Sequence, residues 1–538
     1  MFVQHPLIKP NKIEDRAYQA SLSRTCLETS TLIVLPTGMG KTVIALRVIA
    51  EILLKEGGKV LVLAPTKPLV EQHASFLREN LVGKRVVCLT GEVDPGEREV
   101  CWLENDVIVS TPQVIANDLR YERISLRDVR LIVFDEAHRA VGNYAYVRIA
   151  EEFKEYGRLV MGMTASPGSS GAKIEEVCRN LGIQRVEVRS ESDPDVAPYM
   201  QDVEMQIIEV DIPDEMKGII RILRAMFESC VRDLITLGLM DEKRPVTRKY
   251  LLEIGETIQE RLNSGEKRSQ LYRGLSLQAM ALKINHALEL AETQGATALA
   301  NYLERIRSEA MSENGSRASR SIVQSDDFER IRDMLRRTKM EHPKLSRVMS
   351  IVSNQIIARP ESRTIVFTHY RDTCELVASK LSKIEGARVA KLVGQAERGE
   401  EKGLKQKEQV EVLEKFRKGD FNVIVATSVG EEGLDVASTD LVIFYEPVPS
   451  EIRSIQRRGR TGRQRPGRVV ILKTRGTRDD AYFFTSQRKE KAMRRRLFQI
   501  NKELQNMECT AEKGGKGEST ELKRDQKEGG QKTVFDFL

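Results

Sequence analysis

Residues 35–42 read LPTGMGKT and combine two glycines with a Lys-Thr pair, a pattern that suits phosphate binding. They follow the β-branched run TLIV and precede the apolar run TVIALRVIAEILL, so a strand, a loop and a helix are predicted in that order. We expect the backbone N–H groups to surround the phosphates, Lys41 to bridge the β- and γ-phosphates, and the Thr42 hydroxyl to bind Mg²⁺. The phosphate-loop pattern begins with glycine, where this chain has Leu35. The residues expected to contact ATP are Pro36, Thr37, Gly38, Met39, Gly40, Lys41 and Thr42.

A pair of carboxylates follows a second apolar run, in the stretch LIVFDEAH. Asp135, at the end of the expected strand, can hold Mg²⁺ partly through water. Glu136, beside it, can polarise the water that attacks the γ-phosphate. The alternative, an acidic surface loop, does not explain why the pair follows a buried strand.

The stretch QRRGRTGR at residues 456–463 supplies a third group of candidate residues. Arginine carries a permanent charge on a planar fork that matches phosphate oxygens. Arg460 and Arg463 are therefore expected to reach the γ-phosphate from a second domain, with Gln456 in the same catalytic group. A structural or purely nucleic-acid-binding role for this basic turn is the alternative.

Hydrophobic patterning divides the chain into four regions. Short apolar runs that alternate with helical stretches predict an α/β domain with a parallel sheet at 1–205, and the same pattern returns at 339–508. Apolar residues at helical spacing predict an all-helical insert at 206–338. Residues 509–538 are predicted to form a flexible tail, because they are rich in charge and glycine and lack apolar periodicity.

Bulk composition sets limits on the class of protein. The chain has 538 residues, 40% of them hydrophobic and 31% charged, and neither a signal peptide nor a membrane-spanning run is apparent. Seven scattered cysteines favour a reducing compartment, so we expect a cytoplasmic, nucleoid-associated protein, or a nuclear one in a eukaryote. The net charge is +7, and residues 451–500 hold 16 Lys and Arg against 4 Asp and Glu. Such a cluster fits either a phosphate-binding surface or a solvated helix face.

Taken in order along the chain, these motifs resemble those of superfamily 2 helicases. RAYQ at 16–19 resembles the adenine-reading Q motif, which implies Gln19 and Arg16 as nucleotide contacts. ATSVGEEGLD at 426–435 resembles motif V, which implies Gly433 and Asp435 as further nucleotide contacts. The fold implied is two RecA-like parallel-sheet domains with an all-helical insert between them and a disordered C-terminal tail.

Further motifs imply roles in nucleic-acid contact and in coupling. APTKPLV, TGE, STPQV and IVFTHY resemble motifs Ia, Ib and IV, and such motifs contact successive phosphates without reading the base sequence. TASP at 164–167 resembles motif III, and His138 belongs to the DEAH motif. The coupling residues implied are His138, Thr164 and Ser166. The DNA contacts implied are Pro65, Thr66, Gly91, Thr111, Pro112, Thr368 and Thr427.

The finer details resemble the Hef branch, which contains archaeal Hef proteins and the Fanconi anaemia M-type and Mph-type DNA translocases. The resemblance implies ATP- and Mg²⁺-dependent 3′→5′ translocation on forked, branched or duplex DNA, and remodelling of stalled forks and Holliday junctions. Hef proteins also carry a nuclease domain, whose carboxylate cluster is not apparent here, so a separate nuclease chain is a possible partner. An RNA helicase or double-stranded-RNA-dependent ATPase of the RIG-I and Dicer type stays open, as does a non-catalytic scaffold.

The last eight residues, QKTVFDFL, place apolar side chains on one side of a helical turn. They resemble the motif that binds the sliding clamp PCNA, with Leu538 where a second aromatic is usual. Docking of such a short apolar helix into a groove would hold the enzyme on DNA. A tail that folds back onto the enzyme is the alternative. The clamp-binding residues implied are Gln531, Val534, Phe537 and Leu538.

Overall fold

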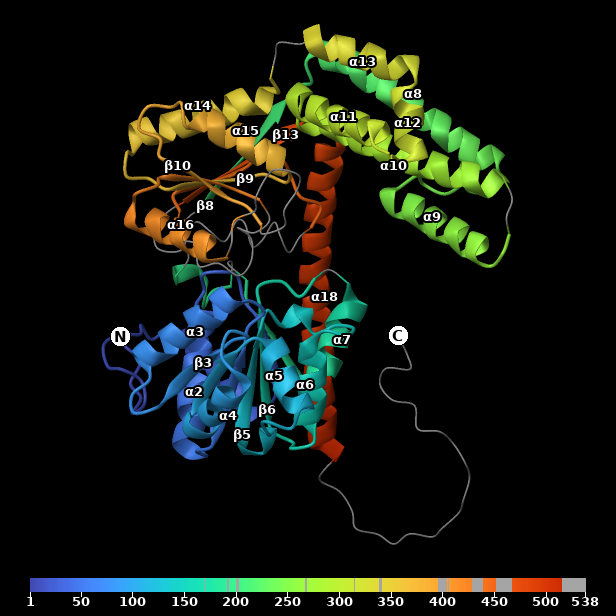
Figure 1. Ribbon diagram of the computed structural model, residues 1–538. Helices are drawn as coiled ribbons and strands as arrows, with labels where there is room; N and C mark the ends of the chain where they lie inside the picture. Colours follow the sequence, from blue (N-terminus) through green and yellow to red (C-terminus); the bar gives the residue numbers. More distant parts are fainter. Residues whose placement is uncertain are drawn as a thin grey trace.

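Two parallel sheets, a helical insert and a long C-terminal helix make up the computed structural model (Figure 1). The residues that it describes are 1–168, 170–190, 193–199, 203–266, 269–313, 315–337, 341–394, 404, 406–427, 439–450 and 467–514.

The first sheet confirms the α/β pattern predicted for the N-terminal region. In the part of the chain that the structure describes, its strands are all parallel, in the order β3-β4-β2-β5-β6-β1-β7. Most are short apolar runs buried on both faces, as expected when helices cover both sides of a sheet. The strands are β1 (Thr31–Val34), β2 (Lys59–Leu63), β3 (Val86–Leu89), β4 (Val107–Ser110), β5 (Val129–Asp135), β6 (Leu159–Thr164) and β7 (Arg185–Val188).

Helices cover this sheet on both faces and form two apolar cores. One face packs against α1 (Ala17–Glu28), α2 (Lys41–Lys55) and α3 (Lys67–Asn80). The other face packs against helices that include α4 (Pro95–Glu104), α5 (Pro112–Arg120), α6 (Ala145–Lys154) and α7 (Gly171–Leu181). Because the strands are parallel, their carboxyl ends lie along one edge, where ligands bind in such sheets.

The second sheet is also parallel and has the order β10-β11-β9-β12-β13-β8 within the described residues. It is covered by α14 (Pro343–Ala358) and α15 (Arg371–Leu381) on one face and by α16 (Gln406–Lys418) on the other. Its strands are β8 (Val203–Val210), β9 (Thr364–Phe367), β10 (Val389–Leu392), β11 (Val423–Ala426), β12 (Leu441–Phe444) and β13 (Gly467–Thr474).

Strand β8 corrects the predicted boundary between residues 205 and 206. It pairs with β13 along its whole length, from Val203 opposite Gly467 to Val210 opposite Thr474. The segment before the insert therefore belongs to the second sheet. Its sequence, VEMQIIEV, largely alternates polar with apolar residues, as suits an edge strand, so it lacks the continuous apolar run by which the buried strands were recognised.

The insert is all-helical, as predicted, and has a core of its own. Figure 1 shows its helices projecting sideways from the second sheet. The helices are α8 (Asp214–Thr236), α9 (Arg248–Asn263), α10 (Ser269–Thr293), α11 (Ala296–Met311), α12 (Arg317–Val323) and α13 (Asp326–Arg337).

Buried polar contacts fix the insert to the second sheet. Lys344, fully buried on α14, donates a hydrogen bond to Thr293 O at 3.1 Å at the end of α10. Its ammonium group also forms an ion pair with Asp479, which is 1% exposed. Thr373 on α15 donates to the side chain of Gln294 at 2.7 Å. The insert and the second sheet therefore share a joint that bare apolar packing would not specify.

The last described helix, α18 (Arg478–Gly514), begins at the second sheet and runs down beside the first (Figure 1). It crosses the predicted boundary between 508 and 509, so the first residues assigned to the tail are helical. No described helix combines the length and the apolar character that a bilayer crossing requires.

Candidate active site

The loop between β1 and α2 has the shape of a phosphate cradle. Gly38 and Gly40 have φ angles of 83° and 73°, in the left-handed region that glycine adopts without steric cost. A Cβ at Gly40 would lie 2.5 Å from Gln19 Nε2, so a larger residue there would displace the Gln19 side chain. Lys41 opens α2 and donates to Leu35 O at 3.0 Å, which closes the loop around the N-terminus of the helix. That N-terminus favours negative charge.

Replacement of Gly40 by alanine should raise the ATP concentration for half-maximal turnover by about tenfold, because strain and contact with Gln19 would distort the loop. Gly83→Ala is the matched control: its φ is 68°, but an added Cβ there meets nothing within 4 Å. Steady-state ATPase titrations of both variants make the comparison. Equal shifts in the two variants would contradict a role for the Gln19 contact.

Gln19, which the resemblance implies as an adenine contact, lies against the phosphate loop. Its Nε2 donates to Met39 O at 3.2 Å, and the neighbouring Tyr18 hydroxyl donates to the same oxygen at 2.8 Å. Gln19 Oε1 is buried and accepts no hydrogen bond from the described residues. A buried acceptor of this kind fits the exocyclic amino group of adenine. Arg16, at the start of α1, stacks on the Tyr199 ring at 5.0 Å.

Asp135 ends β5 and is held by a histidine that the sequence reasoning missed. His73 Nε2, on α3, lies 2.8 Å from Asp135 Oδ2, and both side chains are buried. Burial alone would raise the pKa of Asp135, but the hydrogen bond with His73 and the charge of Lys41 lower it. The carboxylate therefore stays ionised, as a Mg²⁺ ligand must. A single His on a helix 62 residues away gave no local signal of this pairing.

Glu136 has a strained backbone next to this pair. Its φ of 48° is left-handed, which costs a non-glycine residue about 1–3 kcal/mol and is typical of functional sites. Glu136 Oε2 is buried and accepts no hydrogen bond from the described residues, although His138 Nδ1 lies 3.3 Å away. An acceptor without a donor at this place is suited to holding a water molecule.

The three predicted coupling residues lie together. His138 Nδ1 is 3.1 Å from Thr164 Oγ1, and the Ser166 N–H donates to the same oxygen at 3.1 Å. Pairing of β5 with β6 sets Asp135 opposite Met163, and this register brings the two motifs side by side. The sheet therefore assembles the DEAH stretch and the TASP stretch into one cluster.

These residues fit ATP with Mg²⁺. Thr42 and Asp135 offer oxygen ligands, and no group of three or more His, Cys, Asp or Glu in the described ranges could hold a metal by itself. Mg²⁺ commonly takes only one or two protein ligands and completes its shell with phosphate oxygens and water. The predicted Gln456, Arg460, Arg463, Gly433 and Asp435 lie outside the described residues, as do Gln531, Val534, Phe537 and Leu538.

The predicted DNA contacts lie at the carboxyl ends of strands. Gly91 is exposed, and Pro65, Thr66 and Thr111 are half-buried at the starts of helices or just before them. The others are buried. Pro112 opens α5, Thr368 donates through its hydroxyl to Tyr370 O at 3.4 Å, and the Thr427 N–H donates to Leu392 O at 3.1 Å. A direct contact through these two threonine hydroxyls would require the chain around them to move.

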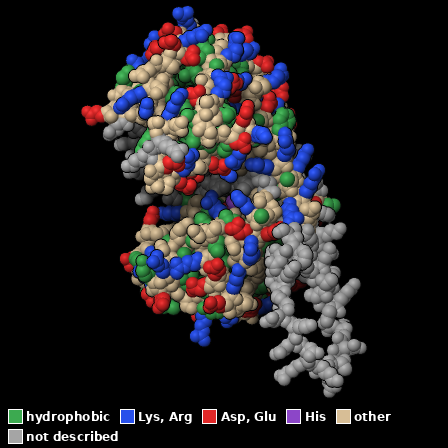
Figure 2. Space-filling model, turned by 90° about the vertical axis from the view of Figure 1, so that its right-hand side faces the viewer, with side chains coloured by type: hydrophobic (Ala, Val, Ile, Leu, Met, Phe, Trp, Pro, Cys, Tyr) green, Lys and Arg blue, Asp and Glu red, His purple; other side chains and the backbone are tan. Residues whose placement is uncertain are grey.

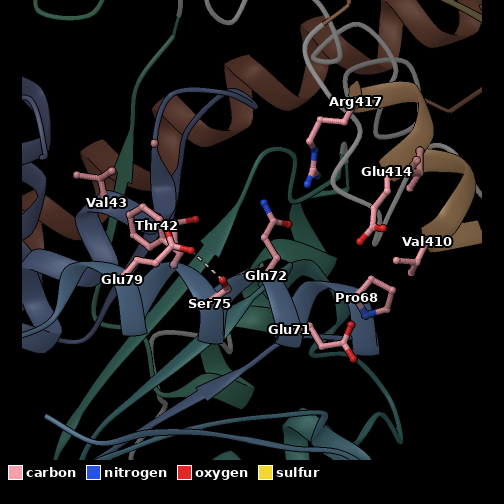
Figure 3. Close-up of a pocket in the computed structure, with 13 residues that line it drawn as sticks. Thr42, Val43, Pro68, Glu71, Gln72, Ser75, Glu79, Val410, Glu414 and Arg417 are labelled. Atoms are coloured by element: carbon pink, nitrogen blue, oxygen red, sulfur yellow. Dashed lines mark hydrogen bonds between the residues drawn. The ribbon is translucent and has the colours of Figure 1, made fainter. Parts of the chain in front are cut away.

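A cavity of about 660 Å³ lies between the two sheet domains beside the phosphate loop (Figure 3). Gly40 of the phosphate loop and Thr42 and Val43 of α2 line it together with residues of α3. Its opposite wall is α16 of the second sheet, with Glu414 and Arg417 pointing toward α3. Figure 2 shows that the surface is also hollowed between the two lobes, with Lys and Arg side chains along the hollow. Groups from both domains thus face the edge that carries the phosphate loop.

Three family models match successive parts of the chain. They are a DEAD/DEAH box helicase at 16–174, a helical bundle described as "Putative ATP-dependent RNA helicase" at 215–342, and a helicase conserved C-terminal domain at 344–465. None of the three is a nuclease.

Individual relatives agree with these matches. The crystal structure of the Pyrococcus furiosus Hef helicase domain is similar with a TM-score of 0.68 and 47% identity, covering 89% of this chain and 100% of that one. "Putative ATP-dependent RNA helicase MJ1505" of Methanocaldococcus jannaschii is 40% identical over 94% of this chain and 64% of its own length. The ATP-dependent DNA helicase mph1 of Neurospora crassa is 33% identical over 87% of this chain and 41% of its own. The chain thus spans less than two thirds of the length of these two curated relatives. It belongs to the Hef and Mph1 branch of the DEAD/DEAH-box superfamily 2 helicases.

Proposed function

We propose that this chain is a DNA translocase that moves 3′→5′ and remodels branched DNA such as stalled forks and Holliday junctions. The observation that carries the proposal is the cavity between the sheets, with Thr42 of the phosphate loop on one wall and α16 on the other. A nucleotide bound at that edge would draw the second sheet toward the first. Hydrolysis would release it, and nucleic acid lying across both sheets would be pulled along.

The chemistry rests on groups of the first sheet. Lys41 and the N-terminus of α2 would hold the phosphates, Thr42 and Asp135 would hold Mg²⁺, and Glu136 would orient the attacking water. When bound, Mg²⁺ neutralises charge on the phosphate oxygens. In this proposal Arg460 and Arg463 complete the site from the second domain.

Support for DNA over RNA comes from the mph1 relatives. The mph1 proteins are described as DNA helicases, and their matches span most of this chain. An RNA helicase is the second candidate, because the matching helical bundle and MJ1505 are both described as RNA helicases. The contacts proposed here go to phosphates and do not read the 2′-hydroxyl that distinguishes the two polymers.

The helical insert is proposed to grip the duplex or junction. Arg221, Lys243 and Arg248 are exposed on it. Arg224 and Arg244 are paired with Glu292 and Glu253, so part of its positive charge is neutralised within the insert. Contact through such a surface would be insensitive to base sequence and sensitive to salt.

ATP turnover with a panel of polymers tests the proposal: single-stranded, duplex, forked and four-way DNA, and double-stranded RNA at equal nucleotide concentration. Forked or four-way DNA should stimulate turnover most. Stimulation by double-stranded RNA with none by forked DNA would overturn the assignment to DNA and favour the second candidate.

The last eight residues are proposed to dock on a sliding clamp, a role for which the sequence motif is the support. A full-length Phe537→Ala variant should lose clamp binding in a pull-down with purified clamp while keeping its ATPase activity. Unchanged clamp binding would refute this assignment.

A further inference from the structure

The long helix α18 begins among contacts with the helical insert. The Arg478 guanidinium donates to Asn285 Oδ1 at 2.7 Å and to Asn285 O at 3.1 Å, both on α10. The Tyr482 hydroxyl donates to Glu289 Oε1, on the same helix, at 3.0 Å. The first turns of α18 are therefore tied to the insert as well as to the second sheet.

The middle of α18 belongs to the first sheet. Met493 is 4% exposed and is part of the apolar core on the face covered by α5, α6 and α7. Arg496 forms an ion pair with Glu175 of α7 and lies against Gly171, where a Cβ would come within 2.6 Å of its Nε. Gly171 opens α7, and a cation is disfavoured at a helix N-terminus. The Glu175 carboxylate and the close fit must therefore hold the Arg496 guanidinium there.

Met493 also contacts the cluster of coupling residues. The Ser166 hydroxyl, 1% exposed, donates to Met493 Sδ at 2.9 Å. From Ser166 the contacts continue through Thr164 and His138 to Glu136, the residue assigned to the attacking water. A side chain of the C-terminal helix thus stands at one end of a continuous series that reaches the DEAH motif.

We propose that Met493 is a positioning residue, through which α18 transmits the position of the helical insert to Glu136. The proposal rests on the function given above, because it takes the insert to be the part that grips nucleic acid. A continuous helix rises about 1.5 Å per residue and is stiff along its axis, so movement of its first turns displaces its middle. Because a close-packed core does not absorb such a displacement, the TASP stretch, which contacts Met493 through Ser166, must shift with it.

The test compares four single variants and one double variant by steady-state ATP turnover with the polymer that stimulates the wild type most. Met493→Ala removes the contact in the middle of α18, and Tyr482→Phe removes one of the hydrogen bonds between its first turns and the insert without changing shape. Met493→Leu keeps the packing volume. Arg495→Ala, an exposed neighbour, is the control.

We expect Met493→Ala and Tyr482→Phe each to lower the stimulated kcat by about fivefold, within the range of measured coupling energies. The KM for ATP should stay within about twofold, and Met493→Leu should restore most of kcat. A double variant, Met493→Ala with Tyr482→Phe, should be no slower than the slower single one, because both substitutions act on the same connection. If Met493 had only a structural role, Met493→Ala would instead lower the melting temperature and raise the KM for ATP. The effects of the two substitutions on kcat would then multiply in the double variant.

Multiplying effects in the double variant, or a wild-type kcat in Tyr482→Phe, would overturn the inference. Because Tyr482→Phe is nearly isosteric, the test survives even if Met493→Ala fails to fold. Failure of the proposed function has a different signature: DNA does not stimulate the wild type. If RNA stimulates instead, the same comparison decides the inference with RNA, and if no polymer stimulates, both are wrong.

Discussion

Replacing Glu136 by glutamine should lower ATP turnover by about a hundredfold to a thousandfold at saturating ATP and leave ATP binding intact. Glutamine has the same shape but cannot take up a proton from the attacking water. Glu136 Oε2 is buried and accepts no hydrogen bond within the described residues, and glutamine keeps a polar atom near His138 Nδ1, which lies 3.3 Å from that oxygen. The loss should therefore fall on kcat.

Two measurements separate these effects. Titration with a fluorescent ATP analogue gives binding, and single-turnover hydrolysis gives the chemical step. Glu151→Gln, an exposed glutamate of α6, is the matched control and should turn over at the wild-type rate. Glu136→Gln with undiminished single-turnover hydrolysis would refute the role of Glu136.

Replacing Lys344 by alanine should lower the free energy of unfolding by about 3–5 kcal/mol, the usual cost of leaving one member of a buried ion pair without its partner. Lys344 is fully buried and Asp479 is 1% exposed. Asp479 Oδ1 already accepts no hydrogen bond from the described residues, and Oδ2 would keep only the Thr474 N–H at 2.8 Å. The joint between the insert and the second sheet should loosen first.

Thermal and urea unfolding would measure the loss of stability, and hydrogen exchange of α10 and α14 would locate it. A multidomain chain need not unfold in one step, so exchange at the joint is the more informative signal. Arg305→Ala breaks the ion pair between Asp372 and Arg305, whose side chain is 54% exposed. This substitution should lower the free energy of unfolding by less than about 1 kcal/mol. An equal loss in the two variants would contradict the energetic role of burial.

Local patterns predicted the strand and loop positions of the phosphate loop and the DEAH stretch. The phosphate loop and the DEAH stretch each follow an apolar strand, and parallel strands bring their carboxyl ends to one edge. Gln19 and the motifs around Thr164 were placed by resemblance, and the structure brings each to the same edge. Such features are predictable because each motif carries its own strand or helix.

Features that depend on distant parts of the chain were missed. His73 reaches Asp135 only because α3 packs across the sheet, and β8 is recognisable only when paired with β13. The contact between Met493 and Ser166 joins residues 327 positions apart. No local periodicity encodes such a contact, because the amphipathic pattern of a helix does not say which core receives it.

The claim that ATP hydrolysis by this chain drives movement on branched DNA is tested most directly by a labelled four-way junction with mobile arms. With the wild-type chain and ATP, the junction should resolve into two duplex products, and Glu136→Gln should give none. Equal resolution by the two proteins, or resolution without ATP, would contradict the account.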